Sequence, residues 1–83
     1  MGLVLVFSTI NDLTDYLIGR VDKARASGNT CIFVDSVQFK NYSKYRDAVN
    51  LLFANRNEKI EARPCPRGYY DFIVTWKKEE IAS

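Results

Sequence analysis

Hydrophobic residues recur along this chain with two different periods, and the change between the periods predicts the order of its elements. Residues 3–7 form a continuous apolar run, which is typical of a buried strand. Apolar residues then return at spacings of three and four, as on one face of a helix: Ile10, Leu13, Leu17, Val21 and Ala24. Thr9, with Asp12 three residues later, supplies the N-cap of this helix, and Gly28-Asn29 ends it.

The middle of the chain repeats the pattern of strand and helix. Residues 31–34 are apolar and predict a second buried strand. Residues 36–41 are compatible with two structures, because they can extend this strand or begin the next helix early with Ser36 as its cap. A second helical face follows and ends at residues 55–57; its apolar members are Tyr45, Ala48, Val49, Leu52 and Phe53.

The last third predicts two strands joined by a tight turn. Residues 59–63 alternate between polar and apolar side chains, as in a strand with one wet face. Residues 64–68 read Pro-Cys-Pro-Arg-Gly and predict a turn, because proline cannot donate a ladder hydrogen bond and glycine tolerates a positive φ. A final strand pairs with residues 59–63 as an antiparallel hairpin, and one of its faces carries Tyr70, Phe72, Val74 and Trp76.

Together these elements predict one compact domain of the α/β (α+β) class that spans residues 1–83. The order β-α-β-α-β-β folds into a four-stranded mixed sheet with two helices. The first two strands are expected to be parallel, because a strand–helix–strand crossover is right-handed in ~98% of cases. A length of 83 residues supports a single domain.

This order of elements resembles two known small architectures, the C-terminal domain of bacterial translation initiation factor three and the Alba chromatin proteins. Both bind nucleic acid, so the resemblance implies a nucleic-acid partner for this chain. It covers most of the chain as an order of elements, and no family motif is matched residue by residue. Where the Alba proteins have a lysine- and glycine-rich loop before the first helix, this chain has Ser8-Thr9-Ile10-Asn11.

The first two predicted strands are apolar on both faces. Two helices on one side of a sheet leave its other side in water, and they cannot cover all the side chains of residues 3–7. Either the helices lie on opposite faces of the sheet, or another chain covers the exposed face. We therefore expect a homodimer or a protein partner.

The composition excludes several chemistries. The chain has no His, so it lacks Ser-His and Cys-His catalysis and an imidazole metal ligand. Cys31 and Cys65 stand singly, far apart in the sequence, which predicts free thiols without a disulfide or a bound metal. The apolar run at residues 3–7 is too short for a membrane span or a signal peptide. We expect a cytoplasmic protein that is no enzyme and has no membrane association, catalytic residue, metal or other cofactor.

For two residues, a chemical role remains an alternative to a purely structural one. Cys65 lies between Arg63 and Arg67, whose charges would lower the pKa of the thiol and favour the reactive thiolate. A rigid turn with an incidental cysteine is the favoured interpretation, because no base is present to complete a cysteine enzyme. Asp35 follows a predicted parallel strand, where α/β proteins often place functional groups, but it has neither a glycine-rich loop nor a second matched acid.

The distribution of charge points to a partner. The net charge is only +2, yet residues 40–67 carry seven basic and three acidic side chains, a net +4, between flanks that are each net −1. Such a basic segment suits a polyanion. We expect phosphate contacts and base stacking from eight residues of this region: Lys40, Lys44, Arg46, Arg56, Lys59, Arg63, Arg67 and Tyr69. Tyr42 is a further candidate for stacking.

Two functions follow from these features. The first is a small non-enzymatic nucleic-acid-binding module, with RNA favoured over DNA because no helix gathers base-reading residues. The second is a protein-binding regulator or inhibitor, antitoxin-like and of viral or plasmid type, that acts through the apolar sheet face or the exposed hairpin edge. In the alternative without a ligand, the basic segment is a solvated surface on which Lys59 and Arg63 pair with nearby carboxylates.

Overall fold

The elements follow one another in the order that the hydrophobic pattern predicts. The computed structural model of the protein describes residues 5–40 and 42–78. The elements in chain order are β1 (Leu5–Val6), α1 (Ile10–Ala26), β2 (Cys31–Gln38), α2 (Tyr42–Asn55), β3 (Glu58–Pro64), the short 3-10 helix η1 (Pro66–Gly68) and β4 (Tyr69–Trp76). The predicted α+β class, with two helices and a four-stranded mixed sheet, is therefore confirmed.

The strands form one sheet in the order β1-β2-β4-β3. β1 is parallel to β2, as the right-handed crossover predicts. β4 is antiparallel to both of its neighbours, so that Ile73 faces Phe33 on β2 and Glu61 on β3. The predicted hairpin is thus confirmed, whereas residues 3 and 4 of the predicted first strand lie outside the described residues.

Helix α1 begins and ends where its capping residues predict. The Asp12 N–H donates a hydrogen bond to the Thr9 hydroxyl at 3.1 Å, which satisfies a backbone donor of the first turn. Beyond the helix the chain reverses at Gly28, whose φ of +86° favours glycine. The face that the spacing predicts is the buried face, with Leu13, Leu17 and Val21 fully buried.

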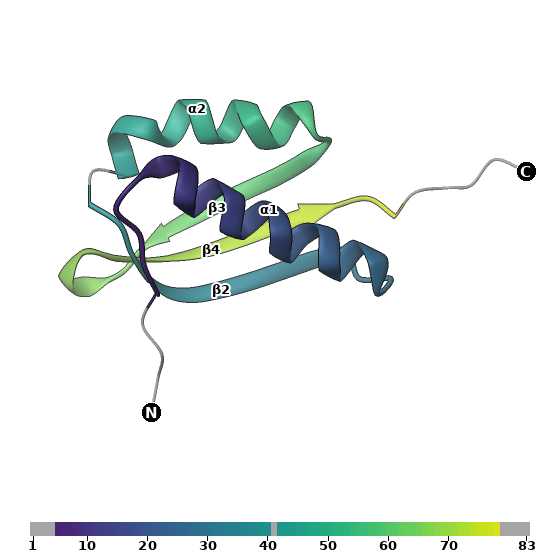
Figure 1. The fold of residues 1–83 in the computed structure, drawn as a ribbon, viewed down its shortest axis with the longest axis horizontal. Coiled ribbons are helices and arrows are strands. Elements are labelled where there is room, and N and C mark those ends of the chain that lie inside the picture. Colours follow the sequence, from purple (N-terminus) through teal and green to yellow (C-terminus); the bar gives the residue numbers. More distant parts are fainter. Residues whose placement is uncertain (1–4, 41, 79–83) are drawn as a thin grey trace, which may run out of the picture.

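Both helices cover the same face of the sheet, as Figure 1 shows. The sheet contributes alternate side chains of β2 and β4 to the core: Ile32, Val34, Phe72 and Val74. The opposite face, which we call the open face, carries Cys31, Phe33, Asp35, Lys59, Glu61, Arg63, Tyr69, Asp71, Ile73 and Thr75. The alternative with one helix on each face is therefore wrong.

Residues 36–41, for which the sequence allowed two structures, mainly extend the second strand. β2 continues to Gln38 through a β-bulge. Ser36 has a φ of +56° at this bulge, and its N–H donates a hydrogen bond to Asp71 Oδ1 at 3.2 Å. The carboxylate of the neighbouring strand thereby satisfies a backbone donor that the bulge removes from the ladder.

The buried face of α2 is rotated from the one that the spacing predicts. Tyr42, Val49 and Phe53 are buried, whereas Ala48 and Leu52 are exposed. The prediction for Ala48 and Leu52 is therefore wrong. The physical reason is that α2 lies over β3 at the edge of the sheet, where a narrow stripe at spacings of three and four is enough to make the contact.

The elements define two ends of the sheet, and the candidate residues divide between them. At one end α2 begins and the β3–β4 turn reverses the chain; at the other, α1 ends, β3 begins and β4 ends (Figure 1). β3 has seven residues, so the two ends lie roughly 20 Å apart.

Neither a membrane-crossing helix nor a metal-ligand group occurs within the described part of the chain. The two helices of residues 5–40 and 42–78 are too polar or too short to cross a bilayer. In the same residues, no three side chains of His, Cys, Asp or Glu lie close enough together to hold a metal ion. Cys31 and Cys65 are both free thiols.

Candidate nucleic-acid interface

Tyr42 anchors the first turn of α2 to the sheet. The residue is 2% exposed, and its ring centroid lies 5.2 Å from that of Tyr70 and 5.1 Å from that of Phe72. Burial raises the pKa of Tyr42 to about 12. The prediction that Tyr42 stacks on a nucleic-acid base is wrong, because the ring is part of the core. The same packing holds the start of α2 beside the β3–β4 hairpin.

Four of the eight predicted residues gather at this end of the sheet. Lys40 precedes α2, Lys44 and Arg46 lie in its first two turns, and Arg67 lies in the β3–β4 turn; we call these four residues the basic end. All four are exposed, and none forms an ion pair within residues 5–40 and 42–78. Helix α2 adds the positive end of its dipole and has no acidic residue in its first turn.

The backbone of the β3–β4 turn holds Arg67 away from the core. Arg67 has a φ of +67° and Gly68 a φ of +80°, so two successive residues adopt the left-handed conformation. The Cys65 N–H closes the turn by donating to the Tyr69 carbonyl at 2.7 Å. Lys40 and Arg67 line a common surface hollow of about 290 Å³. Two cations from separate segments therefore lie over one depression.

The open face holds three more of the predicted residues. Tyr69 is half-buried beside the turn, and Arg63 precedes the last residue of β3. The Arg63 guanidinium pairs with Glu61 at 3.3 Å in an exposed contact, which is worth little to stability. Lys59 is exposed at the far end of β3 and forms no ion pair in the part of the chain that the structure describes.

Arg56 lies at the opposite end of the sheet, in an ion-pair network of Asp22, Arg25, Arg56 and Glu58 that we call the arginine cluster. The Glu58 side chain is 0% exposed and accepts hydrogen bonds from Arg25 at 2.7 Å and from Arg56 at 2.9 Å. Arg56 also donates to Asp22 at 2.7 Å. These partners, Glu58 first, raise the pKa of the Arg56 guanidinium. The structure therefore separates Arg56 from the basic end by the length of β3.

The partners of Arg56 were not expected from the sequence. Lys59 and Arg63, the cations expected to pair with nearby carboxylates, point to the open face, whereas Glu58 points to the helices. Asp22 and Arg25 are three residues apart in the last two turns of α1, and this spacing is the one local signal that places them on a common face. Only the fold brings that pair to the start of β3.

The Cys65 thiol is less acidic than its neighbours in sequence suggest. Desolvation by burial, followed by the hydrogen bond and charge of Asp71, raises the pKa of Cys65. The expectation that Arg63 and Arg67 would lower this pKa is wrong, because desolvation and the carboxylate of Asp71 on β4 outweigh the two guanidinium groups. The thiol also donates weakly to the Arg63 carbonyl at 3.7 Å. The incidental-cysteine interpretation fits this environment.

No protein-family profile, curated protein or solved structure shows a significant match to this chain. The likeness to initiation factor three and the Alba proteins therefore rests on the order of elements. Such a likeness in fold does not determine function.

Proposed function

We propose that this chain is a small, non-enzymatic RNA-binding protein of the cytoplasm, which contacts single-stranded RNA with its basic end. The observation that carries the proposal is that Lys40, Lys44, Arg46 and Arg67 lie at one end of the sheet, on three segments, without an ion-pair partner in the described residues. Cations that no carboxylate engages are available to neutralise phosphates and release their counterions. The dipole of α2 adds to the same positive potential.

The charges of the open face favour contact at the end of the sheet rather than across it. That face carries Asp35, Glu61 and Asp71 against Lys59 and Arg63, a net charge of −1. A phosphate backbone lying along the open face would meet as much repulsion as attraction. Beside the turn, one side chain remains suited to an unpaired base, namely Tyr69, which is aromatic and half-buried.

Single-stranded RNA is favoured over duplex DNA by the shape of the basic end. It consists of a turn and the first turns of a helix, and it presents cations rather than a row of residues that could read base edges in a groove. Sequence-tolerant contact with a flexible strand requires only phosphate neutralisation and stacking. DNA of the same sequence is the direct comparison.

Salt titration of RNA binding tests the proposal. Anisotropy of a labelled single-stranded RNA is expected to give a linear fall of log K with log salt, and the variant K40Q/R67Q should reduce that slope by roughly 1.4, about 0.7 for each lost phosphate contact. The control R20Q/K23Q removes one Lys and one Arg from α1 and should leave the slope unchanged. Binding that is absent, or that both variants weaken equally, would refute the basic end as the site.

A second candidate function, protein binding, is favoured by the centre of the open face. Phe33 is 55% exposed there, beside Ile73 on the neighbouring strand. An exposed aromatic ring among nearly balanced charges suits a protein surface better than a polyanion. A second copy of this chain is the partner that we expect from the sequence.

Light scattering tests the second candidate. The chain has a mass of 9.6 kDa, and a homodimer would double the observed mass at micromolar concentration. Phe33→Ser should shift the equilibrium to the monomer without unfolding it, because the side chain lies on the open face. A wild-type protein that is monomeric throughout would exclude the homodimer and leave the RNA proposal unaffected.

A further inference from the structure

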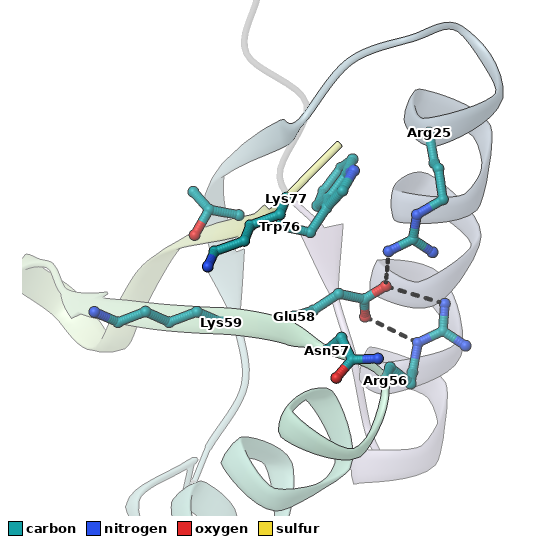
Figure 2. Close-up of a pocket in the computed structure, with 8 residues that line it drawn as sticks. Arg25, Arg56, Asn57, Glu58, Lys59, Trp76 and Lys77 are labelled. Atoms are coloured by element: carbon teal, nitrogen blue, oxygen red, sulfur yellow. Dashed lines mark hydrogen bonds and ion pairs between the residues drawn. The ribbon is translucent and has the colours of Figure 1, made fainter. Parts of the chain in front are cut away.

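A hollow of about 690 Å³ opens at the end of the sheet opposite the basic end. It lies where β3 begins and β4 ends, and Arg25 of α1 contributes to its wall (Figure 2). This volume falls within the range of small-molecule sites, ~300–1,000 Å³. The RNA contact proposed above makes no use of it.

The lining of the hollow has a surplus of positive charge. The two arginines of the arginine cluster are neutralised by Glu58 and Asp22, so they form part of the wall without adding net charge. Lys59 and Lys77 also line the hollow, and neither forms an ion pair within residues 5–40 and 42–78. The uncompensated charge is therefore that of the two lysines.

Lys59 lies on β3, Lys77 directly follows the end of β4, and both are on the same side of the hollow (Figure 2). Lys59 is opposite Thr75 in the β3–β4 ladder, and Lys77 follows two residues after Thr75. Figure 2 shows both lysine side chains extending away from the carboxylate of Glu58. Two ammonium groups and the Thr75 hydroxyl together provide several donors, which is the set that a phosphate dianion requires.

The rest of the hollow is larger than a phosphate group needs and has a different chemistry. Asn57 lines it with an exposed amide, which offers a donor and an acceptor side by side. Trp76 also lines the hollow; the residue is 9% exposed and its ring lies under the Arg25 guanidinium at 5.3 Å, so it closes the hollow without offering a free face for stacking. The exposed amide of Asn57 is the group that suits the hydrogen-bonding edge of a nucleobase.

We propose that this hollow binds a nucleotide by its phosphate monoester, with Lys59 and Lys77 at the phosphate and Asn57 at the base. The chemistry is shared by a free nucleoside 5′-monophosphate and by the 5′-phosphorylated end of an RNA strand. The site is independent of the RNA contact at the basic end, because the two lie at opposite ends of the sheet. An experiment can therefore refute the nucleotide site without refuting the RNA contact, and the reverse.

Tryptophan fluorescence provides the test, since Trp76 is the single tryptophan of the chain and lines the hollow. Adenosine and uridine 5′-monophosphates are expected to change its emission saturably, and the uncharged nucleosides should not. K59Q/K77Q should weaken the binding by roughly ten-fold or more, because it removes both charge-assisted contacts. A 5′-phosphorylated trinucleotide that binds more tightly than the free nucleotides would identify the strand end as the source.

Two controls separate this site from the basic end. K40Q/R67Q should bind the nucleotides as the wild type does, and K59Q/K77Q should retain the salt-dependent binding of RNA. Asn57→Ala should weaken the nucleotides but leave inorganic phosphate unaffected. The proposal is overturned if neither the nucleotides nor the phosphorylated trinucleotide bind, if inorganic phosphate binds as tightly as a nucleotide, or if K59Q/K77Q binds like the wild type.

Discussion

The two ends of the sheet are both rich in cations, yet they use them in opposite ways. In the arginine cluster, the guanidinium groups of Arg25 and Arg56 close on Glu58 at 2.7 and 2.9 Å. At the basic end, none of Lys40, Lys44, Arg46 and Arg67 has such a partner in the described residues. The difference follows from one buried carboxylate, since Glu58 is 0% exposed whereas the basic end contains no buried acid among the described residues.

A buried charge must be paired, and an exposed one need not be. Removing a carboxylate from water costs several kcal/mol unless donors replace the lost hydration, so Glu58 requires its arginines. Exposed lysines keep their hydration and can exchange it for a phosphate at little cost. One end is therefore built for stability, and the other is available for binding.

Removing the buried charge should have the largest effect on folding. Glu58→Gln leaves Arg25 and Arg56 without their main partner and should lower the free energy of unfolding by about 3 kcal/mol. For a domain of this size the midpoint of thermal unfolding should fall by more than about 10 °C. Urea titration measures the loss, and Asp22→Asn, at an exposed carboxylate, should cost less than about 1 kcal/mol. Equal stability of Glu58→Gln and the wild type would contradict the division.

The burial of Tyr42 beneath the basic end should make the stability of the protein depend on pH in the alkaline range. Burial raises the pKa of Tyr42 to about 12, so the phenol stays neutral in the folded chain after the unfolded chain has ionised near pH 10. The resulting stability is complete below pH 10 and is lost as the pH rises toward 12, by roughly 2–3 kcal/mol. Tyr42→Phe should unfold with a flatter dependence across this window in urea titrations. A dependence identical to that of the wild type would show that Tyr42 is accessible to solvent.

The arginine at position 67 is expected to lower the stability of the fold and to strengthen RNA binding. Its φ of +67° disfavours any residue with a Cβ, so Arg67→Gly should raise the free energy of unfolding by about 0.5–1 kcal/mol while weakening RNA binding. Arg67→Gln keeps the left-handed conformation and loses only the charge, so it should weaken binding at unchanged stability. The opposite signs for Arg67→Gly are measured by urea unfolding and anisotropy. If Arg67→Gly lowers both the stability and the affinity for RNA, the arginine side chain also stabilises the turn.

The smallest effect is expected at the exposed pair on β3. Arg63 and Glu61 meet at 3.3 Å with side chains that are mostly in solvent, and Glu61→Gln should change stability by less than about 0.5 kcal/mol. The same substitution frees Arg63 and reduces the negative charge of the open face. RNA binding should stay unchanged, because neither Glu61 nor Arg63 belongs to the basic end. A large loss of stability would place this pair with the arginine cluster instead.

The local pattern was sufficient for most of the fold. The N-cap at Thr9, the spacing of Leu13, Leu17 and Val21, and the alternation along β4 each depend on neighbours within a few residues, and each matches the structure. The preference for right-handed crossovers then predicted, from the order of elements alone, that β1 and β2 are parallel. At residues 36–41 the local pattern is compatible with both a strand and a helix start, and the β-bulge that extends β2 is visible only in the fold.

Local sequence patterns were enough to predict the elements, the α+β class and the basic character of residues 40–67. Tertiary structure alone decided which of those cations remain available. A charge count assigns the same +1 to Arg56 and Arg67, and the prediction for Tyr42 likewise treated a buried ring as an exposed one. The physical reason is that pairing and burial depend on contacts between residues far apart in the chain, such as Arg25 with Glu58, and local periodicity carries no information about those contacts.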